Sequence, residues 1–318
     1  MAASDGAARP LDIVTLGEPL IEFNQTDPAV PAYLQGFGGD TSNAAIAAAR
    51  QGARVAYLTR VGADVFGDLF ERLWRREGVD TSWVVRDPAA HTGVYFVTHG
   101  PAGHAFSYLR AGSAASRMTP QDLPLEPIRG CRWLHVSGIS QAISASACDA
   151  VFAAIRCARE AGAKVSFDSN LRLKLWPLDR ARAVIRATIA LSDLFLPSIE
   201  DARELSGLAE PDAILDWCFT AGAREVVLKL GADGAILADG AGRRRLAGHR
   251  VNAVDATGAG DCFAGALLAR RVAGDAMEAA LAYANAAAAL TTTGYGAVAP
   301  IPTRGQVLAF LDAATRQE

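Results

Sequence analysis

The alternation of strand and helix patterns along the second half of the chain constrains the fold more than any other feature of the sequence. Short apolar runs alternate there with longer helical segments, the first of which spans residues 144–161 and ends at Gly162. The predicted strands of this half are residues 133–137, 164–168, 195–197 and 225–229. Strands joined through helices pair in parallel, and helices then cover both faces of the sheet. The pattern therefore predicts an α/β fold with a doubly wound sheet and a ligand site at the carboxyl ends of its strands.

The first half of the chain contributes further strands and one hairpin of a different kind. Residues 11–17 and 55–59 are apolar runs typical of buried strands. Residues 92–98 and 105–110 instead alternate apolar and polar side chains on either side of a Gly-Pro-Ala-Gly turn. That pattern predicts an antiparallel hairpin outside the parallel sheet.

We expect this hairpin to belong to a small antiparallel β lid, formed discontinuously by about residues 18–37 and 91–111, within a single domain of residues 10–318. A lid would exclude water, which competes as a nucleophile in group-transfer reactions. The remaining predicted helices are an Ala-rich helix that Gly52 ends and residues 66–77, 260–271, 277–293 and 304–314.

The composition argues against nucleic-acid and membrane partners. The formal net charge is -3 over 318 residues, and the longest basic run, Arg243–Arg245, lies between glycine-rich turns as expected of a solvated hairpin. No apolar stretch has the length of a bilayer span, and the N-terminus lacks the pattern of a secretory signal. The five cysteines show no CxxC spacing and are expected to be reduced, buried thiols. We therefore expect a soluble cytoplasmic protein.

Two glycines precede an acid at the start of a long helix, in Gly258-Ala259-Gly260-Asp261. The free amides of Gly258, Ala259 and Gly260 at a helix N-terminus favour a phosphate or its developing charge. Asp261 would repel that anion unless it has chemistry to perform, such as accepting a proton from an attacking hydroxyl. The alternative is that Asp261 only caps the helix.

Residues 255–261 resemble the Asp-Thr-x-Gly-Ala-Gly-Asp motif of the ribokinase-like (PfkB-type) sugar kinases, with Ala256 where the family usually has Thr. The resemblance covers nearly the whole chain. It implies a ribokinase-like fold, Asp261 as the catalytic base and the amides of residues 258–260 as the anion hole. It also implies ATP as the phosphoryl donor, Mg²⁺ as its partner ion, K⁺ as a candidate activator and a homo-oligomer.

A second glycine loop, Gly38-Gly39-Asp40, precedes the Ala-rich helix and is followed by Asn43. It is neither a GxGxxG nor a Walker A sequence. In the sugar kinases a Gly-Gly-x-x-x-Asn loop at this place binds the acceptor sugar, so the resemblance assigns these four residues to the acceptor. Small residues admit a polyol closely, and Asp and Asn supply hydrogen-bonding atoms for its hydroxyls. The alternative is an ordinary capped turn.

The segment from Asn170 to Trp176 follows a predicted strand and resembles the Asn-Leu-Arg-Leu-Lys-Leu-Trp form common in 2-keto-3-deoxygluconate kinases. The guanidinium of Arg172 could hold a carboxylate or a phosphate oxygen in a bidentate manner. The alternative is a solvated loop arginine that pairs with Asp168.

Residues 108–115 resemble a Tyr-x-Arg...Ser-Ala segment of the same kinases. The resemblance implies that Tyr108 and Arg110 contact the keto-acid, together with Tyr95 on the neighbouring strand. Two arginines, Arg110 and Arg172, in one pocket would favour an anionic acceptor. Asp12 and Glu18, at the two ends of the first strand, could be catalytic acids, but without a partner at known spacing they are expected to be turn and strand-end residues. The carboxyl end of the strand, where Glu18 lies, is nevertheless where ligands of α/β proteins bind.

The resemblance also implies a nucleotide site and a metal shell. The residues expected to border the nucleotide are Asn170, Arg172, Lys229, Gly231, Gly234, Gly258, Gly260 and Asn285. Residues 197–201 occupy the place of the family's Asn-x-x-Glu metal motif, with Ser198 for Asn and Asp201 for Glu. Glu200 or Asp201 is therefore expected to act on a water-rich Mg²⁺ shell.

Together these resemblances imply ATP-dependent phosphorylation of 2-keto-3-deoxygluconate at its 6-hydroxyl, a step of the Entner–Doudoroff pathway. The alternatives are another sugar kinase, of the fructokinase or 5-dehydro-2-deoxygluconokinase type, and a non-catalytic sugar-binding regulator. The sequence does not distinguish the gluconate from the galactonate epimer, because one inverted hydroxyl is met by a single side chain or a water.

Overall fold

In the residues that the computed structural model describes (11–27, 29–100 and 103–315), nine strands form the main sheet in the order β13-β12-β11-β10-β9-β8-β1-β4-β5. Their bounds are β1 (Ile13–Leu16), β4 (Val55–Gly62), β5 (Val84–Asp87), β8 (Trp133–Ser137), β9 (Lys164–Asp168), β10 (Leu194–Phe195), β11 (Val226–Lys229), β12 (Ala235–Asp239) and β13 (Gly242–Leu246). All neighbours pair in parallel except β12, which runs antiparallel to both β11 and β13. The parallel sheet expected from the strand and helix alternation is confirmed.

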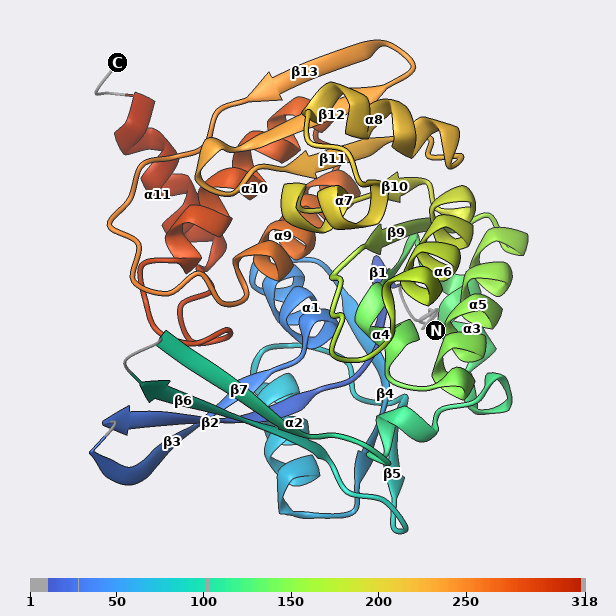
Figure 1. The fold of residues 1–318 in the computed structure, drawn as a ribbon, viewed down its shortest axis with the longest axis vertical. Coiled ribbons are helices and arrows are strands. Elements are labelled where there is room, and N and C mark those ends of the chain that lie inside the picture. Colours follow the sequence, from blue (N-terminus) through green and yellow to red (C-terminus); the bar gives the residue numbers. More distant parts are fainter. Residues whose placement is uncertain (1–10, 28, 101–102, 316–318) are drawn as a thin grey trace, which may run out of the picture.

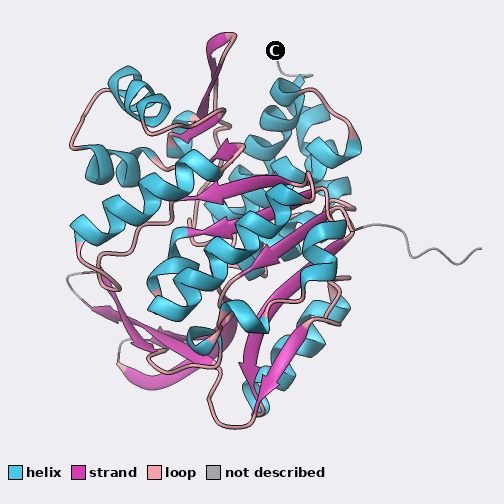
Figure 2. Cartoon of the chain, turned by 90° about the vertical axis from the view of Figure 1, so that its right-hand side faces the viewer, coloured by secondary structure: helices cyan, strands magenta, loops and turns pink. Residues whose placement is uncertain are grey.

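Helices cover both faces of this sheet (Figures 1 and 2). One face carries α1 (Asp40–Arg50), α2 (Val65–Arg76), α9 (Ala259–Ala273), α10 (Met277–Thr291) and α11 (Arg304–Thr315). The other carries α3 (Leu125–Gly130), α4 (Gly138–Ala142), α5 (Ala145–Glu160), α6 (Leu178–Leu191), α7 (Ile199–Ser206) and α8 (Pro211–Thr220). Successive strand residues alternate between the two cores, so that Ile13 packs in one and Val14 in the other. The doubly wound architecture is therefore confirmed.

A second, smaller sheet projects from the main body at the lower left of Figure 1. This lid sheet consists of β2 (Leu20–Asp27), β3 (Val30–Gly38), β6 (Gly93–Gly100) and β7 (Gly103–Leu109), in the order β3-β2-β6-β7. Each hairpin is antiparallel as expected, but β2 and β6 pair in parallel, which corrects the expectation of a wholly antiparallel lid. The parallel pair is geometrically accessible because β2 and β6 are separated by a long crossover through α1, β4, α2 and β5.

The lid sheet is attached to the body by aromatic packing on one face. Phe37 of β3 packs on Phe70 of α2 with ring centroids 5.3 Å apart, and Phe23 of β2 packs on Phe66 at 6.0 Å. These rings extend the main hydrophobic core into the lid sheet. The opposite face of the lid sheet is left to line the cleft.

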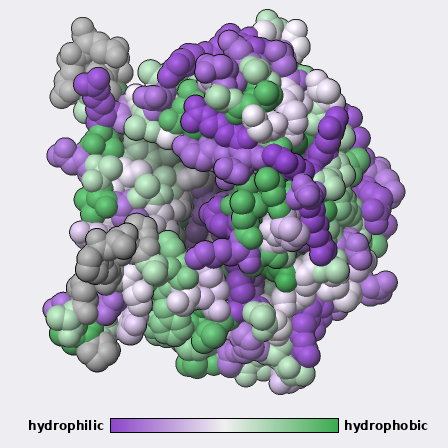
Figure 3. Space-filling model, viewed as in Figure 1, coloured by the Kyte–Doolittle hydropathy of each residue, from purple (hydrophilic) through white to green (hydrophobic). Residues whose placement is uncertain are grey.

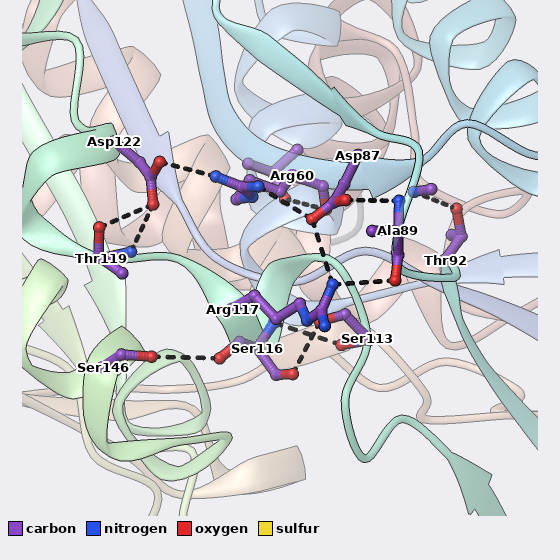
Figure 4. A network of polar contacts seen from close by, with 12 residues as sticks. Arg60, Asp87, Ala89, Thr92, Ser113, Ser116, Arg117, Thr119, Asp122 and Ser146 are labelled. Carbon is purple, nitrogen blue, oxygen red and sulfur yellow. Dashed lines mark hydrogen bonds and ion pairs between the residues drawn. The ribbon is translucent and has the colours of Figure 1, made fainter.

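Both ends of the β6–β7 hairpin are fixed by the polar network of Figure 4. Arg60 of β4 donates to Asp87 (2.9 Å) and to Asp122 (2.7 Å), which lies in the short helix η2 (Pro120–Asp122) beyond the hairpin. Arg117, in the short helix η1 (Ala115–Arg117), donates to the carbonyl of Ala89 at 2.9 Å. The segments before and after the hairpin are thereby both held beside β4.

The basic run forms the expected hairpin, and its charges are paired. Arg243 donates to Asp212 and Asp216 of α8, and Arg244 pairs with Asp239 and Glu278. Opposed acids leave no concentrated positive charge on this hairpin. The five cysteines are all buried and free. In the part of the chain that the structure describes, no helix is both long enough and apolar enough to cross a bilayer.

Close packing of α9 on α1 depends on Gly265, since a methyl group built there would lie 2.3 Å from the carbonyl oxygen of Ala44 and 2.8 Å from the Cβ of Ala47. We expect Gly265→Ala to lower the free energy of unfolding by about 1–3 kcal/mol, because an extra carbon in a packed interface forces backbone shifts. Denaturant unfolding measures this. Gly305→Ala in α11 is the control, since its added carbon meets nothing within 4 Å. Equal stability of Gly265→Ala and the wild type would contradict the prediction.

Candidate active site

The glycine loop before α9 has the geometry of an anion hole. Gly258 is the N-cap of α9 with φ of 78°, a left-handed conformation that favours glycine. A Cβ there would also lie 2.7 Å from the carbonyl oxygen of Ala297, so the loop is pressed against residues 296–298. Ala259, Gly260 and Asp261 form the first turn of the helix, where amides have no partner within the helix. The Ala259 amide donates to the carbonyl of Ala256 at 3.2 Å, so Gly260 and Asp261 carry the candidate anion-binding amides of this turn.

Asp261 is not a helix cap. Its Oδ2 accepts a hydrogen bond from Asn43 Nδ2 at 2.8 Å, and its Oδ1 lies 3.5 Å from Asn170 Nδ2. Burial, together with the neighbouring charges of Asp40 and Asp168, raises the pKa of Asp261 to about 7 against the opposing effects of Asn43 and Lys229. A carboxylate with a pKa near neutrality is suited to accept a proton and to release it again.

The acceptor loop places its polar residues on the first turn of α1. Gly39 has φ of 104°, and a Cβ there would lie 2.5 Å from the carbonyl oxygen of Glu18, so glycine is required. Asp40 and Asn43 follow on one face of the helix. Both oxygens of Asp40 and Oδ1 of Asn43 are buried and have no hydrogen-bond partner among the described residues. Buried acceptors without donors fit a ligand that supplies hydroxyl groups.

Lys229 lies beside the glycine loop that precedes α9. Its ammonium is paired with Asp168 at 2.5 Å, and it lies 3.5 Å from the position that a Cβ on Gly260 would occupy. The end of β11 therefore brings a cation to the anion-hole loop. Asp168 is at the end of β9 and is almost fully buried.

Arg172 has no carboxylate partner among the described residues, because Asp168 is taken by Lys229. The alternative of a solvated loop arginine is thus correct in part, since Arg172 is exposed to solvent but does not pair with Asp168. The guanidinium instead donates to the carbonyl of Leu171 (2.8 Å) and to Asn170 Oδ1 (3.2 Å). Burial raises the pKa of Asp40, and the nearby Ser137 hydroxyl and Thr41 amide, followed by the charge of Arg172, act in the opposite direction.

Asn170 stores local backbone strain next to Asp261. Its φ of 34° is the only positive φ of a non-glycine residue in the described ranges. Such conformations cost about 1 kcal/mol or more and persist where the surroundings enforce them. Here the turn directs the side-chain Nδ2 of Asn170 toward Asp261 and its side-chain Oδ1 toward Arg172.

The lid sheet presents Tyr95 and Tyr108 from one face, with ring centroids 5.9 Å apart. The Tyr95 hydroxyl donates to Glu22, and a Cβ on Gly38 would lie 2.7 Å from that hydroxyl. The guanidinium of Arg110 lies 5.8 Å from the ring of Tyr108. The three predicted lid residues are therefore neighbours.

Arg110 has a buried partner that the sequence did not indicate. Its Nε donates to Glu18 Oε2 at 2.8 Å, its Nη2 donates to the same oxygen, and Ser113 donates to Glu18 Oε1 at 2.5 Å. Glu18 is 1% exposed. Glu18 lies just beyond the end of β1 as expected, and in addition it neutralises Arg110 where the lid sheet joins the body.

A cavity of about 840 Å³ lies between the lid sheet and the loops before α9 and α11. Glu22, Gly36, Asp255 and Thr257 are among the residues that line it. Figure 3 shows the surface hollowed between the lid sheet at the lower left and the C-terminal part of the chain above it. Burial raises the pKa of Glu22, and the charge of Asp255 raises it further. Glu22 is thus a buried carboxylate of the lid sheet that sequence reasoning missed. It connects this cavity to the predicted acceptor residues only through Tyr95, because the lining of the cavity includes neither Asp261 nor Asp40.

The remaining residues assigned to the nucleotide lie around the end of β11. A Cβ on Gly234, with φ of 91°, would lie 2.1 Å from the carbonyl oxygen of Leu246. Gly231, with φ of 60°, begins the short helix η3 (Gly231–Asp233). Asn285 of α10 is buried and donates to the carbonyl of Ala247 at 3.3 Å. Their contact with a nucleotide stays a prediction.

The two acids assigned to the metal shell differ in environment. Asp201 Oδ2 accepts from Ser169 Oγ (2.7 Å) and from the amide of Leu171 (2.9 Å), whereas Glu200 is exposed. No three His, Cys, Asp or Glu side chains gather into a metal cage in the described ranges. This donor set fits an Mg²⁺ ion that keeps its waters and is held chiefly by phosphates. Which acid orients that shell stays a prediction.

Two of the carboxylates not assigned to the site from the sequence, Asp168 and Glu18, carried one usable signal, which is their position at strand ends. Asp168 ends a predicted strand, at the sheet edge where ligands of α/β proteins bind, and so does Glu18 after β1. Glu22 carried no such signal, because its role depends on the contact between β2 and Tyr95 of β6.

Comparison with known proteins gives consistent matches over the chain. Residues 10–304 match the family model described as pfkB family carbohydrate kinase. The 2-dehydro-3-deoxygluconokinase of Bacillus subtilis (strain 168) is 34% identical over 312 residues, which are 95% of this chain and 96% of that relative. Fructokinase-1 of Oryza sativa subsp. japonica is 35% identical over 327 residues, which are 97% of this chain and 100% of that relative. A putative ribokinase II from E. coli, in complex with ATP and Mg²⁺, has a TM-score of 0.88 at 27% identity over 95% of this chain and 99% of that one.

The raised pKa of Asp261 predicts a dependence of stability on pH. Because the folded pKa of about 7 exceeds the ordinary 3.8, the folded state binds the proton more tightly, and the unfolding free energy falls as pH rises between these values. We expect Asp261→Asn to be more stable than the wild type by an amount that grows over this window, on the order of a few kcal/mol at its upper end.

Denaturant unfolding at several pH values measures this difference. Asp12→Asn is the control of opposite sign, because the hydrogen bond from Arg54 lowers the pKa of Asp12. That variant should lose stability at neutral pH and approach the wild type as pH falls below the ordinary value. A stability difference for Asp261→Asn that does not vary with pH would contradict the raised pKa.

Proposed function

The chain belongs to the pfkB family of carbohydrate kinases, and on this premise we propose that it phosphorylates 2-keto-3-deoxygluconate at its 6-hydroxyl with ATP. The fold and family expected from the sequence motifs are confirmed by these matches. The observation that supports the substrate is the guanidinium of Arg172, which has no carboxylate partner among the described residues and lies near the open acceptor atoms of Asp40. A sugar acid supplies both the carboxylate and the hydroxyls that these groups lack.

In this proposal Asp261 accepts the proton of the attacking hydroxyl, and Asn43 orients its carboxylate. Asp40 and Asn43 accept hydrogen bonds from the acceptor hydroxyls. The amides of the anion-hole loop and Lys229 stabilise charge on the transferred group. Mg²⁺, brought with ATP, would neutralise phosphate charge, with Glu200 or Asp201 acting on its water shell.

The acceptor carboxylate is assigned to the side of the pocket formed by Arg172 and the lid sheet. Arg110 is already neutralised by Glu18, so it contributes directed N–H groups more than net charge. Tyr95, Tyr108, Gly38 and Gly39 would enclose the carbon chain between the lid sheet and α1.

Fructose is the second candidate acceptor, since a fructokinase is equally similar to the chain and only one arginine of the pocket lacks a carboxylate partner. A 5-dehydro-2-deoxygluconokinase is a further sugar-kinase alternative. A non-catalytic regulator is disfavoured, because Asp261 is present with its partner Asn43. We further propose activation by K⁺, a cytoplasmic role in the Entner–Doudoroff pathway, and a homo-oligomeric protein without nucleic-acid or membrane partners.

A coupled assay of ADP release tests the proposal across 2-keto-3-deoxygluconate, its galactonate epimer, 5-dehydro-2-deoxygluconate, fructose and ribose. We expect the highest kcat/KM for a 2-keto-3-deoxy sugar acid. Preference for fructose would overturn the substrate but not the kinase reaction. Absence of turnover with every acceptor would overturn the proposed reaction.

Loss of the base should lower kcat without weakening nucleotide binding. We expect Asp261→Asn to reduce kcat by at least ~10²-fold, the usual scale for a general base, with little change in the KM for ATP. Asp12→Asn, at the opposite ends of the strands, serves as the control and should retain activity. Steady-state kinetics measure both, and a fully active Asp261→Asn enzyme would exclude Asp261 as the base.

Loss of the Arg172 guanidinium should weaken the keto-acid as an acceptor more than fructose. We expect Arg172→Leu to raise the KM for the keto-acid by the equivalent of ~1.5–3 kcal/mol, the value of a charge-assisted contact, and to leave the KM for fructose nearly unchanged. Lys174→Leu, an exposed cation two residues away, is the matched control. Equal losses for both acceptors would show that Arg172 does not bind the carboxylate.

A further inference from the structure

Arg50 forms a four-point contact that the proposed reaction does not use. It is the last residue of α1, and its Nε and Nη2 donate to the two oxygens of Glu77 at 2.8 and 3.0 Å. Its Nη1 donates to the carbonyl of Val298 at 3.2 Å and to that of Ile301. The guanidinium thus joins α1 and the end of α2 to a loop almost 250 residues further along the chain.

The loop that Arg50 holds supports the anion hole. Its Ala297 carbonyl is the group that a Cβ on Gly258 would meet at 2.7 Å. The amide of Gly296 donates to Asp255 Oδ2 at 2.9 Å, and Asp255 Oδ1 accepts from the amide of Thr257 at 2.9 Å. Residues 296–301 therefore lie between the Arg50 guanidinium and the loop that begins α9.

Side-chain packing fixes only part of this loop. Val298 and Ile301 are buried in the main hydrophobic core, whereas Ala299 between them is exposed and, like Arg50, lines two cavities of about 840 and 610 Å³. The hydrogen bonds from Arg50 to the carbonyls of Val298 and Ile301 fix the backbone on both sides of this exposed stretch.

We propose that Arg50 is a positioning residue for the anion hole: held by Glu77, it fixes residues 296–301, on which Gly258 and hence the first amides of α9 are seated. The proposal rests on the kinase function proposed above. Arginine is required because its planar fork contacts a carboxylate and two carbonyls at once, whereas lysine has one ammonium. Displacement of catalytic amides by about 1 Å is enough to cost about 10²-fold in rate.

The test compares Arg50→Met, Arg50→Lys and Glu77→Gln with Arg54→Met. Arg54 is a matched control, because it makes the same bidentate contact with Asp12 (2.8 and 2.9 Å) but does not contact residues 296–301. We expect Arg50→Met to lower kcat by about 10- to 100-fold with little change in either KM. Arg50→Lys should show a similarly low kcat, because one ammonium does not replace the guanidinium fork. Added guanidinium ion should partly restore the kcat of Arg50→Met. Glu77→Gln should lower kcat by a smaller factor. This variant tests the same role if Arg50→Met does not fold.

Hydrogen–deuterium exchange of the peptide spanning residues 255–263 gives a readout that does not require turnover. We expect faster exchange there in Arg50→Met than in the wild type or in Arg54→Met. Unchanged exchange, or a kcat no lower than that of Arg54→Met, would overturn the positioning role. If the wild type phosphorylates no acceptor, the proposed function fails, and the exchange measurement still decides whether Arg50 fixes the loop.

Discussion

Burial of Asp261 near Asp40 and Asp168 is the interaction on which the rest of the site depends. Three carboxylates around one buried point repel each other, and the pKa of Asp261 rises to about 7 as a result of burial and of these neighbours. The structure compensates with Lys229 on Asp168, with Asn43 on Asp261 and with the amides at the start of α9. Each compensating group comes from a different strand or helix end, so the site exists only when the sheet edge and both helix starts are assembled.

The acceptor pocket follows from the same electrostatics. Both oxygens of Asp40 are buried, and among the described residues neither accepts a hydrogen bond, which is costly unless a ligand supplies donors. Arg172 lies nearby with no carboxylate partner among the described residues, and Arg110 is neutralised by Glu18. The site therefore combines an unfilled set of hydroxyl acceptors with one available positive charge. The Glu18 and Arg110 pair lies where the lid sheet joins the body and connects the position of that sheet to the pocket it covers.

Much of the site could be predicted because its residues lie in short local patterns. Gly258 to Asp261 shows a glycine loop that opens a helix, and Gly38 to Asn43 shows another. Local sequence also predicted the β6–β7 hairpin of the lid, since alternating polarity around a tight turn is a short-range signal. The parallel pairing of β2 with β6 was not predictable in this way, because it depends on where a long crossover returns the chain.

The sequence by itself determined the doubly wound sheet, the two glycine loops and the candidate base Asp261, since each depends on periodicity or on residues within a few positions of one another. Only the tertiary structure decided which charges meet. Glu18 and Arg110 are 92 residues apart, Asp168 and Lys229 are 61 apart, and Asn43 and Asp261 are 218 apart. An ion pair in a low-dielectric interior depends on distances of a few ångströms, which are set by strand order and helix packing. For that reason the sequence predicted Arg110 and Arg172 as equivalent anion binders, whereas the fold gave a buried partner to only one of them.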